Sequence, residues 1–170
     1  MPAYYNEKGV FMPVSHFLSL LSSPRPAALA NIQGDTVSPV RGFAAFYNIS
    51  SGGTLIQVEV FQLPDQKKPA SSGFFGMHIH DNGNCTPPFD QTGMHYNPTA
   101  QEHPFHSGDL PPLLSSHGYA WMVFYDGRFG VSDIIGKSLI IHENRDDFTS
   151  QPAGDSGRKI ACGVIEVFKG

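Results

Sequence analysis

A long stretch with neither strand nor helix patterning constrains this chain most. Residues 81–118 form a 38-residue segment rich in Gly, Pro, Asn, Asp, Ser and His. An irregular segment of this length is uncommon inside a compact domain unless it carries a function. Seven of the eight histidines lie between residues 78 and 142, within this segment or in strands predicted beside it. The rest of the chain must therefore form a scaffold that holds a long, histidine-bearing loop.

The flanking segments have the pattern of strands. In Leu55–Leu63, Ile and Val alternate with polar residues, which is the period-2 signal of a half-buried strand. The 18 Gly and 14 Pro predict many turns, and the 13 Phe and 6 Tyr suit strands. Strands are predicted over Ala28–Gly34, Arg41–Ile49, Leu55–Leu63, Phe74–His80, Tyr119–Tyr125, Ser138–His142 and Lys159–Phe168. We predict an all-β domain at residues 27–170, preceded by an extension at residues 1–26 that contains a short helix and packs on its own domain or on another subunit.

Charge and hydropathy exclude two classes of partner. The net charge is −4 and no basic run exceeds two residues, which argues against nucleic acid. No apolar stretch approaches the roughly 18 residues of a membrane span. The first residues lack the basic and then apolar pattern of a signal peptide, so a cytoplasmic protein is expected.

The histidines have the spacing of metal ligands. His78 and His80 are two residues apart on a predicted strand, so their side chains point to one face. Four imidazoles suit Cu(II), and three imidazoles with one carboxylate suit Zn²⁺. A lone His-x-His pair is more often without a ligand, but a set of six His and one Asp fits two ions. The candidate ligands are His78, His80, His95, His103, His106, Asp109 and His142.

The two cysteines, Cys85 and Cys162, leave two readings open. They are either two buried thiols or one disulfide that closes a long loop, which would add about 4 kcal/mol in the chain-entropy model. The spacing alone does not decide between these readings, although an oxidising compartment would favour the bridge.

Five motifs, in order, resemble the copper/zinc superoxide dismutase family. They are Gly76-Met77-His78-Ile79-His80, Gly93-Met94-His95-Tyr96-Asn97-Pro98, His106-Ser107-Gly108-Asp109-Leu110, Ile135-Gly136-Lys137-Ser138-Leu139-Ile140-Ile141-His142-Glu143 and Ala161-Cys162-Gly163-Val164-Ile165. The resemblance covers about residues 28–168. It implies an eight-stranded Greek-key β-barrel or sandwich of immunoglobulin-like type with two long functional loops.

The resemblance also implies a role for each candidate ligand. His78, His80 and His142 resemble the ligands of copper alone, and His95 resembles the imidazole that bridges copper and zinc. His103, His106 and Asp109 resemble the remaining zinc ligands. Asp146 matches a carboxylate that links ligands of the two metals, and Cys85 with Cys162 matches the family's intrasubunit disulfide.

Two positions depart from the family pattern. The family's substrate-guiding Arg, three residues before the second Cys, is replaced by Lys159, with Arg158 just before it. Lysine keeps the charge but loses the planar fork, and neighbours on a strand point to opposite faces. Either Lys159 or Arg158 is expected to guide the substrate. Both functional loops are also shorter than in better-known members, which predicts altered Zn affinity and a more open copper site.

The implied activity is superoxide dismutation, an antioxidant oxidoreductase reaction with Cu and Zn as cofactors. The substrate is a small anion, and His95 would carry a proton during the cycle. The alternative is a weakly active or inactive metal-binding module that stores or delivers copper. A third reading is a β-sandwich interaction domain that binds Zn alone, which would leave His78, His80 and His142 without a purpose. A homodimer is possible, because family members dimerise through different surfaces.

Overall fold

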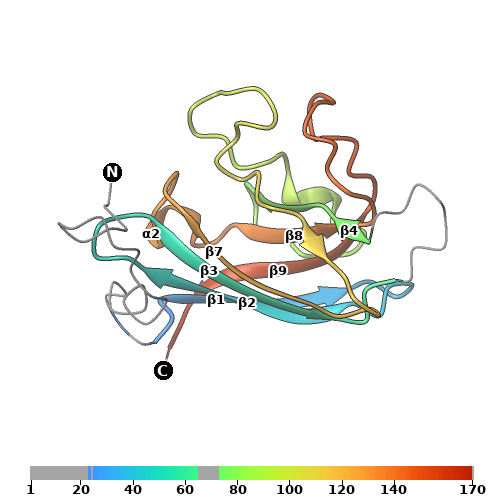
Figure 1. The fold of residues 1–170 in the computed structure, drawn as a ribbon, viewed down its shortest axis with the longest axis horizontal. Helices are drawn as coiled ribbons and strands as arrows, with labels where there is room; N and C mark the ends of the chain where they lie inside the picture. The colour runs from blue at the N-terminus through green and yellow to red at the C-terminus, as the bar shows by residue number, and fades with distance from the viewer. Residues whose placement is uncertain (1–22, 24, 65–72, 170) are drawn as a thin grey trace, which may run out of the picture.

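The computed structural model describes residues 23, 25–64 and 73–169, and nearly all regular structure in this part of the chain is β (Figure 1). The strands are β1 (Ala28–Gly34), β2 (Arg41–Asn48), β3 (Thr54–Phe61), β4 (Phe74–Phe75), β5 (Met77–His80), β6 (Leu113–Leu114), β7 (Ala120–Asp126), β8 (Ser138–His142) and β9 (Lys159–Val167). A 3-10 turn, η1 (Asp90–Thr92), and one turn of helix, α2 (Val131–Ile134), lie in the connections.

Seven strands form one curled antiparallel sheet in the order β5-β8-β9-β1-β2-β3-β7, and β4 pairs with β6. The connections from β3 to β5 and from β7 to β8 cross between the two edges of the sheet, as in Greek-key folds. Two long loops rise from one side of the curled sheet (Figure 1). The predicted all-β class is confirmed.

Alternation along the strands decides which face of the sheet is buried. Ile56, Val58 and Val60 of β3 are all fully buried, and the intervening Gln57 and Glu59 are half-buried. The same alternation on β1 buries Ala28, Ala30 and Ile32 against them. The inward sides of these strands therefore form one apolar core under the curl, which supports the two loops from below.

The observed strands follow the predicted ones with small shifts. The segment predicted as one strand at Phe74–His80 is divided at Gly76, because Gly76 N–H bonds to Asn144 O while Gly76 O accepts from His142 N–H. The pattern in residues 81–118 gave no indication of β6, and the prediction did not include α2. The predicted extension at residues 1–26 lies almost wholly outside the described residues. In the described part of the chain, residues 23, 25–64 and 73–169, no helix is long and apolar enough to cross a membrane.

Cys85 and Cys162 form a disulfide with Cα atoms 5.5 Å apart. Cys162 belongs to β9, and Cys85 lies in the loop after β5, so the bridge ties that loop to the centre of the sheet. Phe89 and Ile140 pack with Cys162 in a small separate cluster. This settles the question that cysteine spacing left open.

The disulfide predicts a large stability difference. The two cysteines are 77 residues apart, and closing a loop of that length removes entropy from the unfolded chain worth about 4 kcal/mol. The variant Cys85→Ala/Cys162→Ala should lose about that much free energy of unfolding in guanidinium titrations of metal-free protein. Wild-type protein treated with a reductant is the control and should behave alike. An unchanged unfolding midpoint in the variant would contradict the prediction.

Candidate metal centre

The long loop after β5 folds back along the free edge of that strand. Tyr96 N–H donates to Ile79 O at 2.8 Å, and Ile79 N–H donates to Gly108 O at 2.9 Å. Two isolated antiparallel bridges continue this pairing, His80 with His95 and His78 with Asp109. Backbone hydrogen bonds to one short strand therefore place loop residues that are distant in sequence directly beside His78 and His80.

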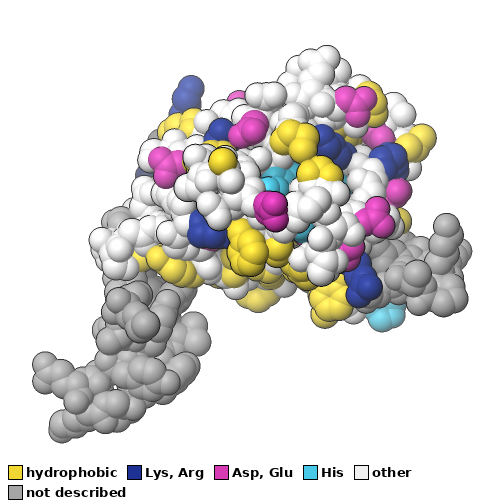
Figure 2. Space-filling view, turned by 90° about the horizontal axis from the view of Figure 1, so that it is seen from above, with side chains coloured by type: hydrophobic (Ala, Val, Ile, Leu, Met, Phe, Trp, Pro, Cys, Tyr) yellow, Lys and Arg dark blue, Asp and Glu magenta, His cyan; other side chains and the backbone are white. Residues whose placement is uncertain are grey.

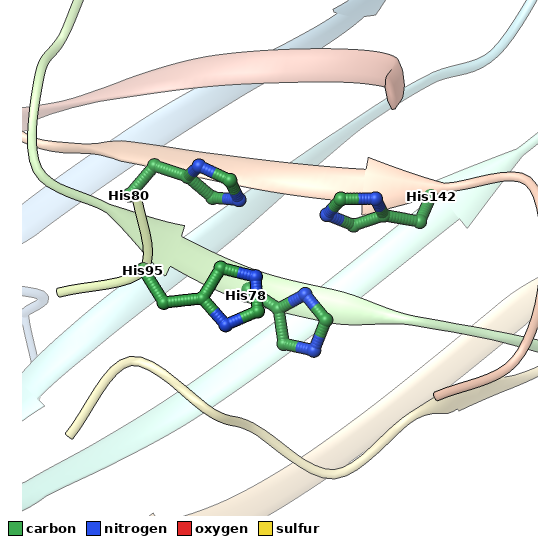
Figure 3. A group of neighbouring side chains, drawn as sticks. All are labelled: His78, His80, His95 and His142. Atoms are coloured by element: carbon green, nitrogen blue, oxygen red, sulfur yellow. The ribbon is translucent and has the colours of Figure 1, made fainter. Parts of the chain in front are cut away.

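Four imidazoles converge above the sheet (Figure 3). His78 and His80 come from β5, His142 from the end of the neighbouring β8, and His95 from the loop. One ring nitrogen from each lies within 4.8 Å of the others. All four residues are buried, with 4% or less of their surface exposed. This tetrahistidine group consists of His78, His80, His95 and His142.

A second group shares His95 with the first. Its members are His95, His103, His106 and Asp109, and their ligand atoms also lie within 4.8 Å of one another. Asp109 Oδ1 accepts a hydrogen bond from His95 Nδ1 at 2.7 Å, so Nδ1 faces this second group. The two nitrogens of an imidazole point in different directions, so His95 can serve both groups. We call the second set the trihistidine–aspartate group.

Asp146 joins the two groups from outside. Its Oδ2 accepts from His78 Nε2 at 2.7 Å, and its Oδ1 accepts from His103 Nε2 at 2.9 Å. Phe148 N–H also donates to Oδ1. Gly154, at a φ of 67°, leaves room for this link, because a Cβ there would stand 2.0 Å from Asp146 Oδ1. The loop after β8 thus orients one imidazole of each group.

The buried ring nitrogens fit bound metal ions. On His78, His80 and His142 one nitrogen bonds to Asp146, Gly93 O or Gly157 O. The other nitrogen of each ring is buried and has no hydrogen-bond partner among the described residues. His103 Nδ1 and His106 Nδ1 also lack hydrogen bonds in this part of the chain, although they lie 3.1 and 3.2 Å from Asp109 Oδ2. One nitrogen held by a protein acceptor and the other left free is how metal-binding histidines are oriented.

The electrostatics keep these ligands in their metal-binding forms. Burial lowers the pKa of His78 and His80, and it lowers that of His142 to about 3, so the rings are neutral at pH 7. Burial alone would raise the pKa of Asp109. The hydrogen bond from His95 and the nearby imidazoles outweigh burial and lower that pKa to about 2.

The structure separates the two basic residues proposed as substrate guides. Lys159 Nζ donates to Thr92 Oγ1 at 2.8 Å and lies 3.4 Å from the carbonyls of Phe89 and Gly93. Gly93 O is also the acceptor of His80 Nδ1–H. Arg158 Nη1 instead bonds to Asp35 Oδ2 at 2.8 Å. Lys159 therefore adjoins the tetrahistidine group, whereas the Arg158 side chain is paired with Asp35 and Glu143.

Two contacts to the trihistidine–aspartate group were not anticipated from the sequence. The side chain of Gln151 bonds to both backbone polar groups of His103, through Oε1 to N–H and through Nε2 to the carbonyl. The guanidinium of Arg128 bonds to the carbonyls of His106 and Asp109. Both side chains bond to backbone atoms. Every residue has the same backbone groups, so no sequence motif could have revealed these contacts.

The chain is similar to known proteins over most of its length. Residues 40–165 match the family described as copper/zinc superoxide dismutase (SODC). The chain is 32% identical to the superoxide dismutase [Cu-Zn] of Deinococcus radiodurans, covering 79% of this chain and 81% of that one. It is also 32% identical to a copper chaperone for superoxide dismutase from Rattus norvegicus, covering 82% of this chain and 52% of that one. A double mutant of a SOD-like protein from Bacillus subtilis superposes with a TM-score of 0.67 at 28% identity, covering 81% and 96% of the two chains.

The lowered pKa values predict a pH-dependent stability of metal-free protein. His142 titrates near 6.5 when unfolded and near 3 when folded, so below about 6.5 the unfolded chain binds more protons. The free energy of unfolding should therefore fall as the pH decreases from 6.5 towards 3. Loss of the Asp109 contribution as the pH falls through 3.8 towards 2 acts in the same direction.

Urea titrations of metal-free protein between pH 7 and pH 4 test this expectation. In the variant His142→Gln the free energy of unfolding should depend less steeply on pH, because the variant lacks the imidazole that takes up a proton on unfolding. His117→Gln is the matched control, because His117 is exposed and outside both groups. A wild-type stability that does not change over this range would contradict the prediction.

Proposed function

Because this chain belongs to the copper/zinc superoxide dismutase family, we propose that it converts two superoxide anions and two protons into dioxygen and hydrogen peroxide. One superoxide loses an electron and becomes dioxygen. The second gains that electron and leaves as peroxide after it takes up two protons. The observation that carries the proposal is the pair of buried imidazole groups that share His95.

We assign copper to the tetrahistidine group and zinc to the trihistidine–aspartate group. Four neutral imidazoles suit Cu(II), and three imidazoles with a carboxylate suit Zn²⁺. When bound, copper would supply the one-electron chemistry that both half-reactions need. Support for the assignment comes from the unpartnered ring nitrogens and from the low pKa of Asp109, which keeps that carboxylate ionised.

The protein's own residues orient the imidazole rings, exclude water from the two groups and transfer protons. Asp146, Gly93 O and Gly157 O fix the rings of His78, His80 and His142 by holding one nitrogen of each. The two groups are buried, and near the middle of the loop-bearing face imidazoles show only in small areas between other side chains, while a further histidine side chain is visible at the edge of the view (Figure 2). His95 Nδ1 faces Asp109, which leaves Nε2 as the nitrogen that can take up and release a proton on the side of the tetrahistidine group.

Lys159 is the proposed guide for the anion. Burial is the main cause that lowers the pKa of His80 and His142, and the charge of Lys159 adds to it in both cases. Its ammonium therefore acts at the tetrahistidine group, where an anion would arrive. A net charge of −4 repels anions on average, so a local positive charge is needed to offset that repulsion. Arg158 is paired with Asp35 and has the weaker claim.

A second candidate function is copper storage or delivery with little turnover. Two observations favour it: one of the relatives is a copper chaperone, and Lys159 is held by Thr92 and by backbone carbonyls. A lysine has only three N–H donors, so one that is bonded internally has few left for substrate. Turnover distinguishes the two functions, because both require bound copper.

The variant His142→Ala tests the dismutase assignment. Wild-type protein loaded with both metals should contain about one Cu and one Zn per chain, because each group has its own ligand set. The variant should lose superoxide consumption and copper while retaining zinc, since His142 belongs only to the tetrahistidine group. Elemental analysis and a superoxide assay give the readouts, with His117→Ala as the control. Metals bound by wild type without turnover would favour copper storage or delivery.

Salt dependence and charge variants test the guiding role of Lys159. Activity should fall as ionic strength rises, because electrostatic steering contributes roughly 10-fold or more to association. Lys159→Ala should lose a similar factor in kcat/KM and flatten the salt dependence, whereas Lys159→Arg should keep the charge and most of the rate. Arg158→Ala should have the smaller effect. A salt-independent rate, or a larger loss in Arg158→Ala, would refute the assignment.

A further inference from the structure

The turn between His106 and Asp109 carries two of the four members of the trihistidine–aspartate group. Asp109 N–H donates to His106 O at 3.1 Å, and His106 N–H donates to Asp109 Oδ2 at 3.0 Å. On one side the turn is joined to β5 by the bond from Ile79 N–H to Gly108 O. A carbonyl oxygen has two lone pairs, so His106 O, which accepts the bond from Asp109 N–H, can still accept from a second donor, as can Asp109 O.

Arg128 supplies that donor. Its Nη1 donates to His106 O at 2.7 Å, and its Nη2 donates to Asp109 O at 2.5 Å. One planar guanidinium thus bonds to the carbonyls of the first and last residues of the turn. A guanidinium holds its donors in a fixed fork, so the distance between the two carbonyls is set by the side chain.

Arg128 is itself held by the sheet. Asp126, 6% exposed at the end of β7, accepts from Arg128 Nε at 3.0 Å and from Nη2 at 2.6 Å. Thr54 of β3 pairs with Asp126, and its Oγ1 donates to the carbonyl of Phe129. The guanidinium is therefore fixed to β3 and β7, the last two strands at one edge of the sheet, and the turn is connected through it to that sheet.

The ion pair between Arg128 and Asp126 also sets the net charge next to the trihistidine–aspartate group. A lone guanidinium next to two metal ligands would repel a divalent cation. Because Asp126 neutralises it, Arg128 presents N–H donors to the turn while adding little net positive charge. This combination suits a residue that positions metal ligands through their backbone.

We infer that Arg128, held by Asp126, is a positioning residue that sets the metal affinity and ligand geometry of the trihistidine–aspartate group through the carbonyls of His106 and Asp109. The inference rests on the proposed assignment of zinc to this group. Positioning contacts of this kind are worth about 10- to 100-fold in metal affinity.

Arg128→Lys is the sharpest variant, because lysine can still pair with Asp126 but has no fork to hold both carbonyls. We would load metal-free protein with Co²⁺ alone and follow its visible absorption. The dissociation constant for Co²⁺ should rise about 10- to 100-fold. The absorption band at saturation should also change, which a general loss of stability would not produce. Arg41→Lys, an exposed arginine on β2, is the matched control and should leave both unchanged.

Two further variants keep the test decisive. Asp126→Asn keeps the guanidinium but removes its counter-charge and the acceptor of Nη2, so Co²⁺ should bind more weakly than to wild type. Circular dichroism of metal-free protein shows whether Arg128→Lys folds. If it does not, the double variant Asp126→Asn/Arg128→Gln removes both charges together. It should show the loss of Co²⁺ affinity and the altered absorption band. Copper binding at the tetrahistidine group should be unchanged in Arg128→Lys.

The outcomes separate this inference from the proposed function. Wild-type Co²⁺ affinity and band in Arg128→Lys would overturn the inference and leave the dismutase proposal intact. An equal loss of Cu²⁺ and Co²⁺ affinity would overturn it too, by showing a general effect. A wild-type protein that binds neither Co²⁺ nor Zn²⁺ would remove the metal assignment and this inference together, whereas missing superoxide turnover with normal Co²⁺ binding would count only against the dismutase.

Discussion

The pairing of the long loop with the free edge of β5 is the interaction on which the metal centre depends. A strand of four residues at the edge of a sheet would otherwise expose unpaired backbone groups. Instead, Tyr96 and Gly108 bond to both backbone groups of Ile79, and the register places His95 beside His80 and Asp109 beside His78. The same hydrogen bonds that cover the edge thus bring ligands from strand and loop into one place.

Burying so many polar side chains is costly unless each has a partner. Here the partners come from the two loops and the sheet: Asp146 joins His78 to His103, while Gly93 O and Gly157 O accept from His80 and His142. In the part of the chain that the structure describes, one buried ring nitrogen is left without a hydrogen bond on each of five histidines, His78, His80, His103, His106 and His142. The protein therefore keeps an unfavourable set of buried lone pairs that bound metal ions would satisfy, in keeping with the tendency of active sites to be less stable than their scaffold.

Contacts from elsewhere in the fold hold the two long loops. Gln151 bonds to both backbone polar groups of His103, and Arg128 clamps the turn that carries His106. The disulfide fixes the start of the β5 loop to β9. The loop after β8 and the turn after β7 thus each supply one side chain that supports the trihistidine–aspartate group, and both act through backbone atoms.

The sequence by itself determined the all-β class, most strand positions and the set of candidate ligands. Alternation in β3 and the His78–His80 spacing are local patterns, and local patterns are legible in a linear chain. It could not determine which of Lys159 and Arg158 faces the tetrahistidine group, whether the cysteines pair, or that Arg128 and Gln151 support the ligands. Those outcomes depend on long-range contacts: Arg158 is drawn to Asp35, 123 residues away, and Arg128 reaches carbonyls whose positions are set by the fold. Tertiary structure decided them because backbone acceptors look the same at every position in the sequence, and only folding brings particular ones within reach of a side chain.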